Sequence, residues 1–160
     1  MERVVSTRLM KIAYNTGLYC INQTRTLPHR SMVNAAVLLQ QWIKESQFAK
    51  KKVSSDFLDV KGGFDNVDYQ KLLDRLEGNP KVLLYLNDWI RNFIATRKIF
   101  LAYPESPRRS YEVDNGIPQG SPLSPLLFVM YVKPLHLATD LSEFCRTSYV
   151  DDFQITVASN

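Results

Sequence analysis

Apolar residues recur every three or four positions in several stretches of this chain, which is the spacing of one face of a helix. Residues 124–132 are apolar on nearly every side, so a helix there should be largely buried. Residues 1–30 show no period that favours either kind of element. The predicted helices cover residues 31–45, with Ser31 as the cap, and residues 67–76, 80–93 and 124–132.

Strand patterns separate these helices. β-branched and aromatic residues favour a pleated surface, and they predict strands at residues 53–60, 98–103, 110–113 and 147–157. Pro104 and Pro107 lie between the predicted strands at 98–103 and 110–113, which predicts that these two strands form a hairpin. The last stretch should form two short strands hinged at Asp151 and Asp152. This order of elements predicts an α+β fold, an antiparallel sheet with helices packed on one face.

Composition narrows the class of protein. A chain of 160 residues has the length of one domain, and it contains no apolar run that could cross a bilayer and no secretory signal pattern. These features predict an intracellular protein, nuclear or cytoplasmic, with no membrane contact. The net charge of +4 fits a polyanionic partner without identifying one. Cys20 and Cys145 belong to no metal-binding pattern and are expected to be buried free thiols.

Three polar features carry candidate chemistry. Asp59 ends a predicted strand, a loop rich in glycine and proline covers residues 116–122, and Asp151 and Asp152 are adjacent within an apolar segment. If the first strand lies beside the last pair, three carboxylates converge. Such a group could hold two magnesium ions about 3.5 to 4 Å apart and support phosphoryl transfer. The alternatives are a strand-end carboxylate at Asp59 and a surface turn at the aspartate pair.

The same segments resemble three successive motifs of reverse transcriptases, most closely those of non-LTR, LINE-type retrotransposons. The tetrapeptide YVDD is weak evidence alone, whereas the thirteen residues of the middle motif are highly specific. Order and spacing also agree, so the resemblance spans residues 53–157 and extends more loosely from Arg30. The motifs read FLDVKGGFDNV at 57–67, GIPQGSPLSPLLF at 116–128 and YVDD at 149–152.

This resemblance implies an RNA-directed DNA polymerase, a nucleotidyltransferase that adds deoxynucleotides to a primer 3'-hydroxyl. Its partners would be an RNA template, a DNA primer and deoxynucleoside triphosphates. The implied architecture is a polymerase palm plus partial fingers, with partial fingers at residues 1–52 and the palm at residues 53–160, truncated before the thumb.

The resemblance also assigns roles to the metal-binding residues. Asp59 and Asp151 would be the main ligands of two Mg²⁺ ions, or of Mn²⁺ in their place. The Val60 carbonyl would add an oxygen, and the third catalytic carboxylate, Asp152, would lie beside them in a less direct role.

Four further residues would bind the nucleotide. Phe64 would exclude a ribose 2'-hydroxyl, Gln119 would lie against the incoming nucleotide, and Gly120 would permit close backbone approach. Arg30 resembles a basic residue near the template or triphosphate. Core packing for Phe64, and a structural amide bonding the loop backbone for Gln119, are the alternatives.

The chain departs from the family pattern at one position, and two functions other than reverse transcription are possible alternatives. The chain has Gly63 where the family usually has alanine, which should loosen the backbone under the nucleotide. A truncated, inactive palm remnant that at most binds nucleic acid or metal is the main alternative. An RNA polymerase-like palm is disfavoured because the Phe64 ring leaves no room for ribose.

Overall fold

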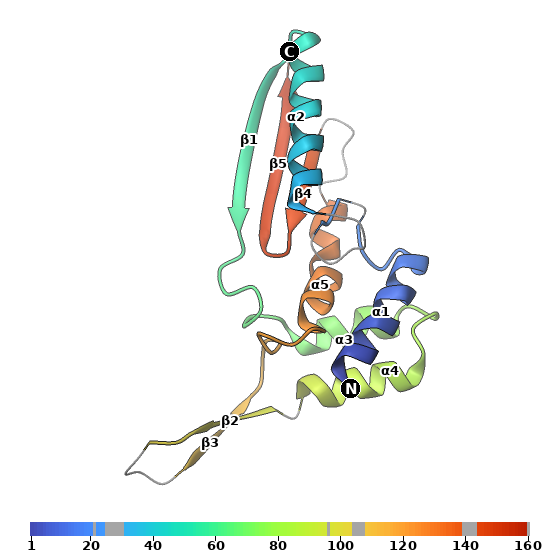
Figure 1. Cartoon of the computed structure of the whole chain (residues 1–160), viewed down its shortest axis with the longest axis vertical. Coiled ribbons are helices and arrows are strands. Elements are labelled where there is room, and N and C mark those ends of the chain that lie inside the picture. Colours follow the sequence, from blue (N-terminus) through green and yellow to red (C-terminus); the bar gives the residue numbers. More distant parts are fainter. Residues whose placement is uncertain (21, 25–30, 96, 104–107, 139–143, 160) are drawn as a thin grey trace.

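The structure is a computed structural model. It describes residues 1–20, 22–24, 31–95, 97–103, 108–138 and 144–159. A three-stranded sheet with one long helix stands above a group of four helices, and a two-stranded hairpin projects from that group (Figure 1). The elements in chain order are α1 Glu2–Thr16, α2 Met32–Phe48, β1 Lys52–Asp59, α3 Tyr69–Glu77, α4 Leu84–Ala95, β2 Arg97–Leu101, β3 Arg109–Val113, α5 Ser124–Ala138, β4 Phe144–Tyr149 and β5 Asp152–Ser159.

The three-stranded sheet has the order β1-β5-β4, with both pairs antiparallel. Tyr149 pairs with Asp152, so Val150 and Asp151 form the turn of the β4–β5 hairpin. The hairpin predicted at the aspartates is therefore present, with its turn one residue before the expected centre. Val150 has a φ of 64°, which is strained for a β-branched residue. Its buried side chain, 3% exposed, anchors the turn in the core.

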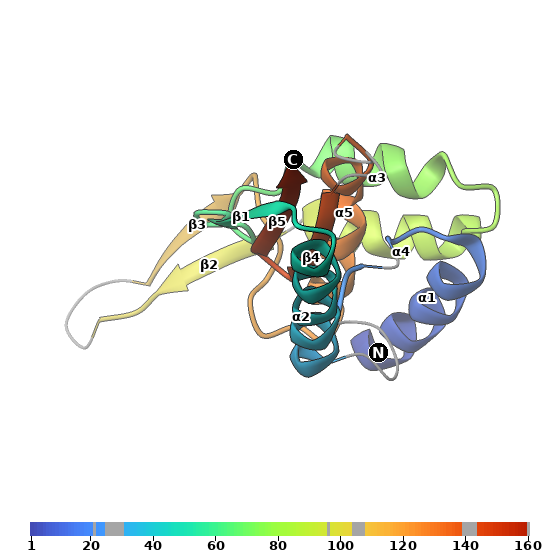
Figure 2. The same cartoon turned by 90° about the horizontal axis from the view of Figure 1, so that it is seen from above.

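Helix α2 packs against β4 and β1 across one face of this sheet (Figures 1 and 2). Ser31 caps it as predicted, accepting from Asn34 N while the Asn34 side chain accepts from Ser31 N. The helix is less buried than its apolar spacing suggested, because Val33 and Val37 point to solvent at 69% and 54% exposure. Ala35 and Leu39 point toward the sheet instead.

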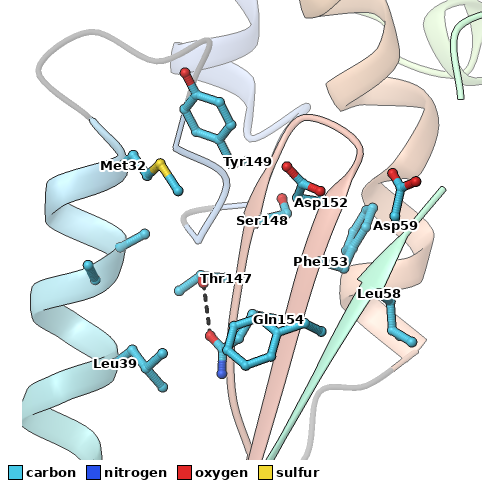
Figure 3. A pocket seen from close by; sticks show the side chains of 13 residues that line it. Met32, Leu39, Leu58, Asp59, Thr147, Ser148, Tyr149, Asp152, Phe153 and Gln154 are labelled. Atoms are coloured by element: carbon cyan, nitrogen blue, oxygen red, sulfur yellow. Dashed lines mark hydrogen bonds between the residues drawn. The ribbon is translucent and has the colours of Figure 1, made fainter.

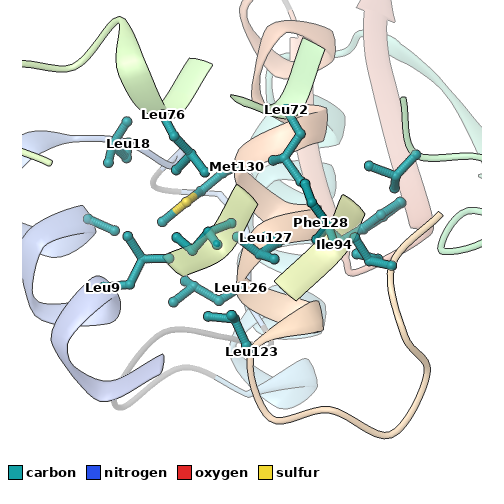
Figure 4. Close-up of a cluster of buried hydrophobic side chains, with 14 of the residues drawn as sticks. Leu9, Leu18, Leu72, Leu76, Ile94, Leu123, Leu126, Leu127, Phe128 and Met130 are labelled. Atoms are coloured by element: carbon teal, nitrogen blue, oxygen red, sulfur yellow. The ribbon is translucent and has the colours of Figure 1, made fainter. Parts of the chain in front are cut away.

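The core lies between α5 and the other three helices of the lower group (Figure 4). The predicted burial of α5 is confirmed, since Leu126, Leu127 and Phe128 are at most 1% exposed. Helices α3 and α4 contribute apolar faces at the predicted spacing. Helix α1 was not predicted, although it buries Val5 and Leu9 in the same core.

The structure also bears on the predicted second hairpin and on the two cysteines. Strands β2 and β3 form the predicted hairpin, which extends away from the helices in Figure 1. Among the described residues neither Cys20 nor Cys145 forms a disulfide, as expected, but each is only half-buried. In the part of the chain that the structure describes, no helix combines the length and the apolar character needed to span a bilayer.

Candidate active site

Strand pairing brings two of the three candidate carboxylates together. Asp59, the last residue of β1, lies directly opposite Asp152, the first residue of β5. The ladder continues one step further, because Val60 N donates to the carbonyl oxygen of Asp151 at 3.1 Å. The predicted placement of the first strand beside the hairpin is confirmed, and residues far apart in the chain meet at one end of the sheet.

None of these carboxylates forms an ion pair with a described basic residue. The ion pairs among the described residues involve Asp68, Glu77 and Glu112, and none reaches Asp59, Asp151 or Asp152. Like charges directly opposite on neighbouring strands are destabilising. The arrangement therefore favours an added cation at this end of the sheet.

The donor chemistry fits a hard divalent cation. Carboxylate and carbonyl oxygens are what magnesium and manganese prefer. The Val60 carbonyl accepts one hydrogen bond, from Gly63 N at 2.9 Å, and keeps its second lone pair. Within the described residues, no three side chains of the types His, Cys, Asp or Glu are gathered closely enough to hold a metal by themselves. Backbone oxygens and a bound substrate would complete such a site.

A largely apolar cavity of about 340 Å³ lies beside the carboxylates, between α2 and the sheet (Figure 3). Met32 and Leu39 form its helix side, and Asp59 and Asp152 line its end near the hairpin turn. None of the described residues that line it is basic. Asp59 and Asp152 are exposed at this end, so a cation can reach both carboxylates from solvent.

The opposite face of the hairpin is held by α5. His136 Nε2 lies 2.9 Å from Ser148 Oγ, and its ring contacts the ring of Phe153. Burial, together with the nearby Arg146 charge, lowers the pKa of His136 to about 4. The imidazole is therefore neutral at physiological pH, and the strands that carry the aspartates are fixed by a neutral polar contact.

The segment after β1 is tied to the glycine-rich loop by backbone hydrogen bonds. Ile117 N donates to Phe64 O at 2.7 Å and Gly116 N donates to Val67 O at 2.9 Å. Gly116 has a φ of +77°, and a Cβ on it would lie 2.6 Å from the carbonyl oxygen of Asp65. Glycine is thus required here for contact between the two segments of protein.

The two loop residues assigned to the nucleotide are exposed. Gln119 Nε2 donates to Asp65 Oδ1 at 3.2 Å, so its amide contacts a carboxylate side chain of the facing segment. Gly120 has a φ of +89°, and a Cβ placed on it would meet no atom of the described residues within 4 Å. The open space at Gly120 leaves room for another molecule to approach the backbone. Arg30, the other predicted nucleotide contact, lies outside the described residues.

Phe64 is partly buried and stacks on Phe128 of α5, with ring centroids 5.0 Å apart. Phe64 therefore takes part in core packing, and this does not exclude the role at the nucleotide that the resemblance implies, because the ring is only partly covered. The three predicted motifs thus meet in one region, through backbone bonds and one ring stack.

Arg97 was missed by sequence reasoning. From the start of β2 its Nη2 donates to the carbonyl oxygens of Asn115 and Gly116 and to the hydroxyl of Tyr69. Tyr69 in turn donates to Val113 O at 3.1 Å. No sequence signal marks an arginine whose partners are mostly backbone carbonyls. The contact braces the start of the glycine-rich loop.

Comparisons with known proteins identify related sequences and a related fold. A family model described as "Reverse transcriptase (RNA-dependent DNA polymerase)" matches residues 1–160. The chain is 35% identical over 91 residues to the "Retrovirus-related Pol polyprotein from type-1 retrotransposable element R2" of Nasonia vitripennis. That match covers 57% of this chain and 9% of the relative, so the chain spans a small part of that protein's length.

The fold also matches a solved structure. It superposes with a TM-score of 0.72 on a chain in the structure of telomerase from Candida albicans in complex with a TWJ fragment of telomeric RNA. The match covers 98% of this chain and 30% of that one, and at 13% identity it shows the fold alone. The predicted α+β palm class and the predicted resemblance to non-LTR retrotransposon enzymes are confirmed. By sequence, the chain belongs to the reverse transcriptase (RNA-dependent DNA polymerase) family.

Proposed function

We propose that this chain is the catalytic region of an RNA-directed DNA polymerase from a non-LTR retrotransposon. It would transfer deoxynucleotides onto a primer 3'-hydroxyl, using RNA as the template. Family membership and the relative from a retrotransposable element support this activity. The observation that carries the proposal is the pairing of Asp59 with Asp152 at the end of the sheet, next to the joined Phe64 and Gln119 segments.

Within this function, Asp59 and Asp151 would hold two Mg²⁺ ions, or Mn²⁺ ions, with the Val60 carbonyl as a further ligand and Asp152 beside them. The family uses divalent metals, and the hard oxygen donors here fit them. When bound, such ions lower the pKa of the attacking hydroxyl and stabilise the charge on the departing pyrophosphate. The antiparallel pairing of β1 with β5 would hold these ligand oxygens in place.

Deoxynucleotide binding would involve the neighbouring segment and loop. Phe64 would lie under the sugar and exclude a 2'-hydroxyl, which disfavours the RNA polymerase alternative. The Gln119 amide, held by Asp65, would face the nucleotide, and the open backbone at Gly120 would allow close approach. Arg30 would contact template or triphosphate. We further propose residues 1–52 as part of the fingers and residues 53–160 as the palm.

Primer extension tests the activity. A homopolymer RNA template with a DNA primer, Mg²⁺ and the complementary deoxynucleotide should give incorporation that Asp151→Asn abolishes. Asp56→Asn is the matched control, because Asp56 is an exposed carboxylate on β1 opposite Ile155 and away from the strand end. That variant should retain activity.

Two outcomes would contradict the proposed polymerase activity. If the chain binds the template–primer duplex in a mobility-shift assay but incorporates nothing with either Mg²⁺ or Mn²⁺, it is an inactive palm remnant. Incorporation that survives Asp151→Asn would remove the aspartates from the chemistry.

A further inference from the structure

We propose that Phe128 is a positioning residue for Phe64, and that the contact between Phe128 and Gly63 sets how well the chain discriminates deoxyribose from ribose. The inference rests on the proposed polymerase activity and extends it to two residues that would not touch the substrate. The stack of Phe64 on Phe128 is the contact through which Phe128 would act.

Phe128 fixes one face of the Phe64 ring. The two rings are stacked with an interplanar angle of 10° and a centroid separation of 5.0 Å, within the range of favourable aromatic pairs. Phe128 is 1% exposed on α5, the most buried helix of the core. A shift of the Phe128 ring therefore requires rearrangement of close-packed neighbours, whereas Phe64 is only partly covered. The direction of support runs from Phe128 to Phe64.

Gly63 makes room for this support. A Cβ built on Gly63 would lie 2.9 Å from Phe128 Cζ and 3.1 Å from Phe128 Cε2, so the ring edge occupies the space of a side chain. Gly63 is not among the positive-φ glycines, so its backbone conformation is open to other residues and the ring is the obstacle. Gly63 is buried and donates to Val60 O at 2.9 Å, so a hydrogen bond restrains the backbone where the sequence predicts loosening.

The Phe64 residue is thus held on two sides. Its carbonyl accepts from Ile117 N at 2.7 Å, and its ring rests on Phe128. Excluding a 2'-hydroxyl depends on the position of a ring relative to one oxygen atom, and displacements of about 1 Å have large kinetic effects. A ring free to tilt would admit ribose more readily. Sugar discrimination should therefore depend on Phe128 and Gly63 as well as on Phe64.

The test measures kcat/KM for dATP and for ATP on a poly(rU) template with an oligo(dA) primer, because these substrates differ only in the 2'-hydroxyl. Phe128→Leu keeps an apolar side chain but removes the planar support. We expect the dATP to ATP ratio to fall by roughly three- to tenfold, the range of one aromatic stack. Leu127→Val is the matched control: it disturbs the same buried helix and should leave the ratio unchanged.

Two double variants show whether Phe128 acts through Phe64. In a Phe64→Ala background, adding Phe128→Leu should change the ratio no further, since the supported ring is gone. Gly63→Ala should lower the ratio by displacing the Phe128 ring, and its effect should not add to that of Phe128→Leu because both act on one contact. Equal losses of kcat/KM for both nucleotides in Phe128→Leu, or additive effects with Phe64→Ala, would overturn the inference.

Failure of the inference is distinguishable from failure of the proposed function. If the unmodified chain incorporates no nucleotide, the proposed polymerase activity falls and the inference falls with it. If the unmodified chain prefers dATP and Phe128→Leu has the same ratio, only the positioning role is refuted.

Discussion

Asp59 faces Asp152 across β1 and β5, and no described basic side chain pairs with either. Removing one charge should therefore stabilise the chain in the absence of a divalent cation while it abolishes activity. We expect Asp59→Asn to raise the free energy of unfolding by about 0.2 to 1 kcal/mol, the range for cross-strand pairs. Urea unfolding in the presence of a chelator measures this gain, and primer extension measures the loss.

The matched variant is again Asp56→Asn, whose carboxylate lies on the same strand opposite Ile155. It relieves no repulsion and should change neither quantity. An Asp59→Asn protein that is less stable than the parent and still active would show that the two aspartates do not repel each other and do not form a site.

Divalent cations should stabilise the folded chain. A ligand that binds only the folded state raises its stability, here by about 2.7 kcal/mol at a hundred times the dissociation constant. Thermal unfolding should shift upward with MgCl₂ or MnCl₂ and should shift little in an Asp59→Asn, Asp151→Asn double variant. NaCl at matched ionic strength controls for screening. Equal shifts in the parent and the double variant would place cation binding elsewhere.

Arg97 should link stability to nucleotide binding. Its Nη2 bonds the carbonyl oxygens of Asn115 and Gly116 and the Tyr69 hydroxyl, while its Nε donates to Ile94 O. Lysine has a single side-chain nitrogen, which cannot take the place of both. Arg97→Lys should cost about 1 to 3 kcal/mol of stability and raise the KM for the deoxynucleotide, because the loop that carries Gln119 loses its brace.

Arg109→Lys provides the comparison, since Arg109 is an exposed residue of the same hairpin, opposite Leu101. It should leave stability and KM close to those of the parent. Equal effects of the two substitutions would mean that the hairpin as a whole, rather than the Arg97 contacts, supports the loop.

Much of this site follows from local sequence signals. The short turn between Tyr149 and Asp152 brings β4 and β5 together as a hairpin, and the β-branched and aromatic residues of the 53–60 segment indicate the strand that pairs with it. Helix α5 was predicted because its apolar run follows a cap at Ser124. These features depend on neighbours in the chain or on strand periodicity, so the sequence alone indicates them.

The features that were not predicted from the sequence depend mostly on contacts between residues that are far apart in the chain. The stack of Phe64 on Phe128 and the bonds from Arg97 to the loop carbonyls join segments that no spacing rule connects. Helix α1 carries Val5 and Leu9 at helical spacing, but charged residues interrupt the pattern and weaken the signal. In α2 the spacing indicated an apolar face but not what covers it, and Val33 and Val37 on that face are exposed.

Two glycines of the loop should respond differently to alanine. Both have positive φ, so each substitution costs about 1 to 2 kcal/mol in backbone strain. Gly116→Ala also forces a Cβ to within 2.8 Å of three backbone atoms of Asp65, whereas Gly120→Ala meets no atom within 4 Å. Urea unfolding should show a clearly larger loss for Gly116→Ala. Equal losses would mean that the two segments are not in contact.

His136 should make stability depend on pH. Burial, with the Arg146 charge, lowers its pKa from 6.5 to about 4 in the folded chain. Well above pH 6.5 the imidazole is neutral in both states and contributes no pH dependence. As the pH falls from 6.5 toward 4, the unfolded chain binds the proton more readily, so stability decreases, by about 3 kcal/mol at pH 4.

His136→Gln isolates this contribution. Glutamine does not titrate and can keep a hydrogen bond to Ser148 Oγ, while the carboxylates of the chain titrate alike in both proteins. Urea unfolding at pH 7, 6, 5 and 4.5 should therefore give curves whose difference grows steadily in favour of the variant as the pH falls. Parallel curves would show that His136 is protonated equally easily in both states, and that the β4–β5 hairpin is not held against α5 by a neutral imidazole.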